Sequence, residues 1–151
     1  MSEKGHSSED NPRQEDSTAE KAKPLLPVKM LSILLFLFGL FAFAGSAFLW
    51  GEGAIFNPPA GVDLAFPITD ILVNAPASIA AAIGLWKMKQ WGYVTSQFVA
   101  GFYVYASVEI FVHVAQDGPP YAMEVAAPQA LAVLIAVALV VYLWRIRDRF
   151  D

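Results

Sequence analysis

The chain of 151 residues has no cysteine and only two histidines, His6 and His113. Without cysteine, this chain cannot form disulfides or hold a metal or an iron–sulfur cluster through thiolates. Haem held by two histidines is also excluded, because His6 lies in a polar N-terminal segment. A di-iron carboxylate bundle uses two Glu-x-x-His motifs, whereas Glu109 and His113 are four residues apart and form a single pair. We therefore expect no cofactor.

Basic residues are missing from residues 51–66 and 116–122, which contain acidic residues but no Lys or Arg. The ten basic residues of the chain lie elsewhere in short clusters, at Lys4, Arg13, Lys21, Lys23, Lys29, Lys87, Lys89, Arg145, Arg147 and Arg149. Most of them flank apolar runs, and none of the clusters forms a compact patch. We therefore expect no nucleic acid among the partners.

Apolar residues make up 56% of the chain, more than the ~45–50% that is usual in soluble proteins. They form four runs, at residues 28–50, 67–86, 91–115 and 123–144. Each run has about 20 residues, the length that an α-helix needs to cross a bilayer. The predicted fold is an all-α, four-helix transmembrane bundle over residues 27–151. Residues 1–26 are mostly polar and are predicted to be a disordered cytoplasmic tail.

The basic residues also predict the orientation of this bundle. They precede the first run, separate the second from the third, and follow the fourth. Because basic loops stay in the cytoplasm, both termini are predicted to be cytoplasmic. The four tryptophans mark the ends of runs, where indole rings favour the membrane interface: Trp50, Trp86, Trp91 and Trp144. The predicted location is the cell inner membrane, with the lipid bilayer as one partner.

The short turn between the second and third runs contains Leu85-Trp86, then Lys87 and Lys89, then Trp91-Gly92. This Leu-Trp-x4-Trp-Gly pattern resembles the cytoplasmic turn of uncharacterised small four-helix bacterial inner-membrane proteins. The resemblance covers this turn alone. It implies a bacterial inner-membrane setting and no activity.

Small residues recur at spacings of three and four in the first two runs, which predicts close packing of helices in lipid. In the first run they are Gly39, Ala42, Gly45 and Ser46, and in the second Ala77, Ala81 and Gly84.

Ionisable and polar side chains gather in the part of the runs predicted to lie near the outer face. Asp70, Asn74 and Ser78 are spaced by four and share one helix face, and so do Tyr105, Glu109 and His113. Since the turn is short, the second and third helices should be neighbours, and their polar faces would form a seam open to the outside. Glu124, at the outer start of the fourth helix, could join it. The predicted seam comprises Asp70, Asn74, Tyr105, Glu109, His113 and Glu124.

Two interpretations of the seam remain open. Polar groups near the interface can be hydrated or can join helices without any ligand. Alternatively, the seam binds an ion, a proton or a small ligand. A metal would take His113, Glu109 and Asp70 as its ligands, although no spacing motif indicates one. Gln97 lies deeper and is expected to make a single interhelical hydrogen bond.

Three functions follow from these interpretations. The first is a non-enzymatic accessory or assembly subunit of a membrane complex, with a protein partner or a second copy of the chain as its neighbour. The second is a small transporter or ion- or proton-binding protein that uses the seam. The third is a membrane-embedded, metal-dependent enzyme, for which the sequence offers no nucleophile–base pair.

Overall fold

The computed structural model describes residues 25–51, 65–117 and 122–151, and these are helical almost throughout, with no strand among them. The predicted tail falls mainly on residues outside these ranges. The long helices are α2 (Leu26–Gly51), α4 (Ala75–Trp86), α5 (Gln90–Asp117) and α6 (Ala122–Arg145). Three short elements complete the described chain: α3 (Ala65–Thr69), the π-helix η1 (Asp70–Asn74) and the 3-10 helix η2 (Arg147–Arg149). The all-α class is confirmed for the described residues.

Three helical segments of the described chain are long and apolar enough to cross a membrane: Leu26–Phe48, Pro67–Trp86 and Ala127–Arg145. They coincide with the first, second and fourth predicted spans. Helix α5 is not among them, although its 28 residues extend over ~42 Å at 1.5 Å per residue. Its polar side chains, among them Gln97 and Glu109, lower its hydropathy. A membrane crossing by α5 stays a prediction.

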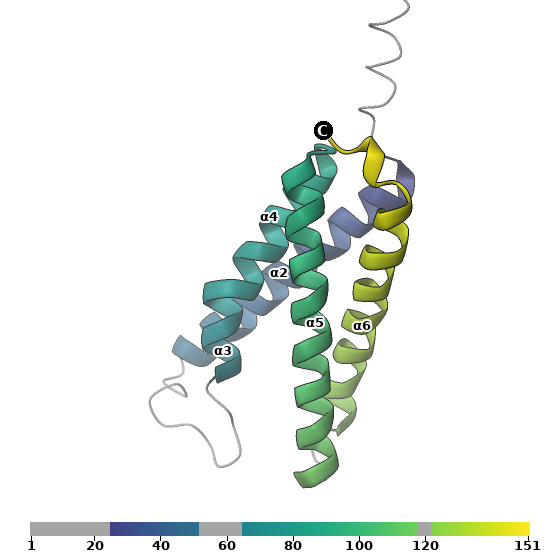
Figure 1. The fold of residues 1–151 in the computed structure, drawn as a ribbon. Coiled ribbons are helices and arrows are strands. Elements are labelled where there is room, and N and C mark those ends of the chain that lie inside the picture. Colours follow the sequence, from purple (N-terminus) through teal and green to yellow (C-terminus); the bar gives the residue numbers. More distant parts are fainter. Residues whose placement is uncertain (1–24, 52–64, 118–121) are drawn as a thin grey trace, which may run out of the picture.

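The long helices form two antiparallel pairs, α2 with α4 and α5 with α6 (Figure 1). Helix α4 also packs against α5, and the turn between them lies at the same end of the molecule as the C-terminus. From that end the two pairs diverge toward α3, and α2 contacts α6 only sparsely. We call the part near the turn the closed half and the part near α3 the open half.

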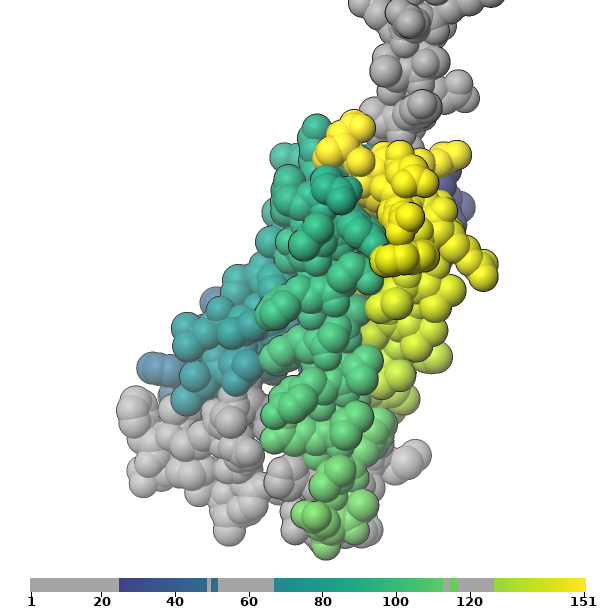
Figure 2. Space-filling model, viewed as in Figure 1, coloured from purple at the N-terminus to yellow at the C-terminus, as the bar shows by residue number. Residues whose placement is uncertain are grey.

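The closed half is tightly packed. Gly84 of α4 and Gly92 of α5 lie so close that a Cβ on either residue would overlap the backbone of the other. Around this crossing, fully buried apolar side chains come from α2, α4, the turn, α5 and α6: Val28, Leu35, Leu85, Met88, Val99, Leu139 and Leu143. The space-filling view shows α5 and α6 packed side by side near this end (Figure 2).

The C-terminal residues complete the closed half. The backbone N–H of Asp151 donates to the carbonyl oxygen of Met88 at 3.0 Å, which ties the chain end to the α4–α5 turn. The Phe150 ring packs against Tyr93, with 5.6 Å between ring centroids. Met88 adopts a positive φ of 52°, which reverses the chain while its side chain stays buried. These contacts join the chain end to the α4–α5 turn and to the start of α5.

Candidate ligand-binding cavity

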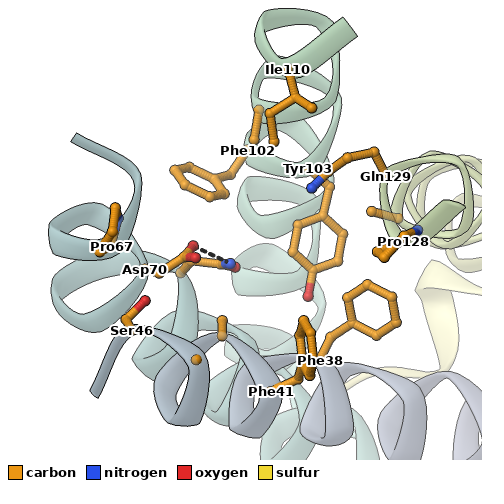
Figure 3. Close-up of a pocket in the computed structure, with 15 residues that line it drawn as sticks. Phe38, Phe41, Ser46, Pro67, Asp70, Phe102, Tyr103, Ile110, Pro128 and Gln129 are labelled. Carbon is orange, nitrogen blue, oxygen red and sulfur yellow. Dashed lines mark hydrogen bonds between the residues drawn. The ribbon is translucent and has the colours of Figure 1, made fainter. Parts of the chain in front are cut away.

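The two helix pairs leave a cavity of about 390 Å³ between them in the open half (Figure 3). It is lined by residues of α2, α3, η1, α5 and α6. The lining residues are Phe38, Phe41, Ala42, Gly45 and Ser46 from α2, Pro67, Asp70 and Asn74 from α3 and η1, Phe102, Tyr103, Ala106 and Ile110 from α5, and Pro128, Gln129 and Ala132 from α6. A volume of this size is in the usual range for small-ligand sites. The walls are mostly apolar and aromatic.

The small residues of α2 have two different roles. A Cβ on Gly39 would lie 3.1 Å from the carbonyl oxygen of Ala75, so Gly39 allows α2 to pack closely against α4. Further along α2, a Cβ on Gly45 would meet no atom within 4 Å. Gly45 lines the cavity, and so does its neighbour Ser46, which is itself buried. At Gly45 the small-residue stripe therefore leaves open space rather than a close helix contact.

The π-helix η1 places the polar residues of the cavity wall. Pro76 follows it in the first turn of α4 and has no N–H to offer the carbonyl four residues earlier. The chain widens here, and the N–H of Ala75 donates to the carbonyl oxygen of Asp70, five residues back. In the wider turn, Asp70 and Asn74 remain nearly in line along one face.

A continuous series of hydrogen bonds leads from the core to the cavity. The Asn74 Nδ2 donates to Asp70 Oδ1 at 2.9 Å, and Ser78 Oγ donates to Asn74 Oδ1 at 3.1 Å. The Ser78 hydroxyl also lies 3.0 Å from the Tyr103 hydroxyl, and both side chains are buried. Because Ser78 has one proton and gives it to Asn74, Tyr103 must be the donor of the last bond. The series therefore points from Tyr103 toward Asp70.

Asp70 is the acceptor at the end of this series. Among the described residues that line the cavity, none is a Lys or Arg. The described basic residues lie toward the opposite end of the molecule, for example Lys87 in the α4–α5 turn, and there Arg147 forms a salt bridge with Asp148. The described residues thus give the Asp70 carboxylate one neutral donor, Asn74, and no compensating positive charge.

The sequence-predicted seam is only partly assembled. Asp70, Asn74 and Ser78 share one face and are hydrogen-bonded, but their partner on α5 is Tyr103 and not Tyr105. Tyr105 is 65% exposed and lies beside Glu109 on a different face of α5. The structure therefore does not bring Tyr105 and Glu109 to Asp70.

The side chains of His113 and Glu124 lie outside the described part of the structure, so their place in the seam stays a prediction. Among the described residues, no group of three His, Asp or Glu side chains is arranged to hold a metal ion. Of the metal ligands predicted from the sequence, Asp70 lines the cavity and Glu109 does not.

Tyr103 is the site residue that the sequence analysis missed. It was hidden because Tyr105, Glu109 and His113 form a more conspicuous polar stripe. A better signal was the series Ser96, Ala100, Tyr103 and Ser107, whose spacings of four, three and four mark the buried face of α5. A tyrosine among small residues on a buried face needs a partner for its hydroxyl.

Two further hydrogen bonds join α5 to α6. Gln97 Nε2 donates to the Leu139 carbonyl oxygen at 3.1 Å, which confirms the predicted interhelical hydrogen bond. Ser107 Oγ donates to Gln129 Oε1 at 3.1 Å. Each of these bonds joins one residue of α5 to one residue of α6. They do not extend the polar series from Tyr103 to the other end of the bundle.

Comparison of the chain with models of known protein families, with curated proteins and with solved structures found no match. The resemblance of the Leu85–Gly92 turn to small bacterial membrane proteins therefore stays a prediction. The function has to be inferred from the cavity itself.

Proposed function

We propose that the protein is a four-span integral membrane protein of the inner membrane, with both termini in the cytoplasm. Three apolar helical segments and the antiparallel α5 between two of them support this topology. Large apolar side chains cover the surface of the bundle, such as Phe41, Leu72 and Leu134, and lipid would cover them. The basic residues of the α4–α5 turn and of the segment after α6 then lie together on the cytoplasmic side.

In this orientation the cavity faces the outer side of the membrane, and we infer that it is a binding site for a cation or a small ligand. The observation that carries the inference is the directed series of hydrogen bonds that ends on Asp70 at the cavity wall. An uncompensated carboxylate at this depth is costly. Binding of a cation or a proton at Asp70 lowers this free-energy cost, so Asp70 favours the binding of a positively charged ligand in the cavity.

The closed half limits what this conformation can do. Gly84, Gly92 and the leucines around them leave no polar route from Tyr103 to the cytoplasmic end of the described bundle. The conformation therefore supports binding from the outside and not a continuous conduit. Transport would require the α2–α4 pair to move relative to the α5–α6 pair so that the cavity opens at the other end.

A second candidate function is that of an accessory or assembly subunit. The packing of the closed half favours this function. A bundle that is closed at its inner end and has a cavity facing outward can receive a side chain or a helix of a partner protein as well as a free ligand. Purification from native membranes in mild detergent distinguishes the two. A stoichiometric partner that stays bound to wild type and is lost from Asp70→Asn would favour the accessory role.

The chain has no cysteine, so single cysteines can report access to the cavity without a further background change. Gly45→Cys places a thiol, which we call the cavity thiol, at the cavity wall where a Cβ meets no atom. We expect it to react with the membrane-impermeant reagent 2-(trimethylammonium)ethyl methanethiosulfonate added outside the cell. Lys87→Cys, in the α4–α5 turn, should react only when the reagent reaches the cytoplasmic face.

Ser96→Cys is the matched buried control, because it is nearly isosteric and lies in the closed half. It should react from neither side. Reaction of the cavity thiol from the cytoplasmic face alone would overturn the orientation. No reaction of the cavity thiol from either face, in protein that is folded by its elution profile, would overturn the accessible cavity and with it the proposed binding function.

A further inference from the structure

The chemistry of the cavity wall narrows the class of ligand. We propose, resting on the binding function above, that the cavity takes an organic ammonium ion, with the charged nitrogen at Asp70 and the carbon substituents against the aromatic rings of α2 and α5. Figure 3 shows Asp70, Phe41, Phe102 and Tyr103 around one space. The proposal depends on this combination of a single carboxylate with aromatic, apolar walls.

The first step concerns charge. Asp70 is the one acidic side chain among the described residues that line the cavity, and none of those residues is basic. The Asn74 Nδ2 donates a hydrogen bond to Asp70, and the Asn74 Oδ1 accepts one from Ser78. The amide is neutral, so it does not neutralise the charge of the carboxylate. A ligand with one positive charge matches this wall, whereas an anion would meet an acceptor without a compensating base.

The second step separates an organic cation from an inorganic one. Magnesium and calcium take six or more oxygen ligands, and transition metals take several nitrogen or oxygen donors. The described residues offer no group of three possible metal-binding side chains. Phe38, Phe41 and Phe102 cannot replace them, because phenyl rings supply no lone pair. An inorganic ion would keep most of its water in a largely apolar cavity.

The third step concerns the rings. A cation within about 6 Å of an aromatic ring is attracted by the negative face of the π system, and apolar substituents gain contact area at the same time. Phe38 and Tyr103 pack together with 5.8 Å between ring centroids and form a fixed part of the wall. Because the Tyr103 hydroxyl is engaged with Ser78, its ring presents an aromatic surface rather than a free polar group.

The test measures protection of the cavity thiol in purified, full-length Gly45→Cys protein in lipid nanodiscs. The thiol is modified with the small neutral reagent methyl methanethiosulfonate, and the rate is followed by mass spectrometry. Three competitors are added: benzyltrimethylammonium, choline, and 3,3-dimethylbutan-1-ol, which is choline with carbon in place of nitrogen. We expect protection in the order benzyltrimethylammonium, then choline, and none from the uncharged alcohol.

Three second-site variants assign the effect to the cavity. Asp70→Asn keeps the size of the side chain and one acceptor oxygen for Asn74 but removes the charge, and should raise the protecting concentration of benzyltrimethylammonium about tenfold or more. Glu109→Gln removes a carboxylate from another face of α5 and should leave it unchanged. Phe102→Leu should raise it several-fold, with a smaller effect on choline, because the ring adds most to the larger cation.

Free ammonium compounds and lipid headgroups share this chemistry, and nanodisc composition separates them. In phosphatidylglycerol nanodiscs the cavity thiol should be open until a soluble cation is added. If phosphatidylethanolamine alone protects the cavity thiol, and Asp70→Asn abolishes that protection, the occupant is the ammonium headgroup of a lipid. Equilibrium dialysis of radiolabelled benzyltrimethylammonium with the unsubstituted protein in phosphatidylglycerol nanodiscs checks that the cysteine itself does not create the site.

Equal protection by the alcohol and by choline, with no effect of Asp70→Asn, would overturn the ammonium assignment and leave an apolar ligand site. No protection by any competitor or lipid, in protein whose cavity thiol is reactive, would also overturn it. Neither result contradicts the outward cavity, which the accessibility of the cavity thiol in cells tests by itself. A cavity thiol that never reacts would overturn the proposed function as well.

Discussion

The closed and open halves are made from the same helices but differ in what lies between them. In the closed half, Gly84 and Gly92 face each other and bring the backbones of α4 and α5 into contact. In the open half, Gly45 faces no helix, and a cavity lies beside it. A glycine in a helix of this bundle thus has opposite consequences in the two halves. Its effect depends on whether the facing helix can approach.

A matched pair of substitutions tests this contrast most strongly. Gly84→Ala should lower the free energy of unfolding by about 3 kcal/mol, because the added methyl group overlaps the α5 backbone. Gly45→Ala should be neutral or slightly stabilising, since the new Cβ meets nothing and alanine is the better helix former. Reversible unfolding in mixed detergent–SDS micelles measures both. A large loss from Gly45→Ala would show that the open half is packed in the membrane.

The next test removes large side chains from each half. Leu139→Ala should cost about 2–3 kcal/mol of unfolding free energy, because Leu139 is fully buried and leaves a void. Phe41→Ala should cost less than about 1 kcal/mol, although more atoms are removed, because the Phe41 side chain is 70% exposed at the cavity mouth. The same unfolding assay applies. Equal losses would contradict the division into two halves.

The smallest expected effect is a difference in unfolding free energy between variants of two tyrosines of α5 that are two residues apart. Tyr103→Phe removes the donor to Ser78 and should cost about 1 kcal/mol of unfolding free energy. Tyr105→Phe should change it by less than about 0.5 kcal/mol, because Tyr105 lies on the exposed face. The two variants share the same chemistry, so each controls the other. A reversed order would restore the seam that the sequence predicts through Tyr105 and Glu109.

Local patterns in the sequence were enough to predict several features of the fold. The apolar runs predicted the positions of the helices, and the shared face of Asp70, Asn74 and Ser78 followed from their spacing. Gly84 lies at a close helix crossing, as its stripe indicated. The single interhelical bond of Gln97 was predicted as well.

The features that sequence patterns missed depend on how the helices face one another. Periodicity gives the angle between Tyr103 and Tyr105 around α5 but does not say which of them points at α4. Likewise, the stripe from Gly39 to Ser46 does not reveal that Gly39 packs against α4 whereas Gly45 faces a cavity. The π-helix at Asp70–Asn74 directly precedes the first turn of α4, which contains Pro76, and no spacing pattern in the sequence predicted it. These outcomes belong to tertiary packing.

The series from Tyr103 to Asp70 has one further property, which is that it can be reversed as a unit. If Asp70 carries a proton and the Asn74 amide rotates by half a turn, Asp70 becomes the first donor and Tyr103 the last acceptor. The hydroxyl proton of Tyr103 is then released from Ser78. The chemical state of the cavity is in this way transmitted to an aromatic ring in the core of the bundle by reorientation of hydrogens, without displacement of a helix.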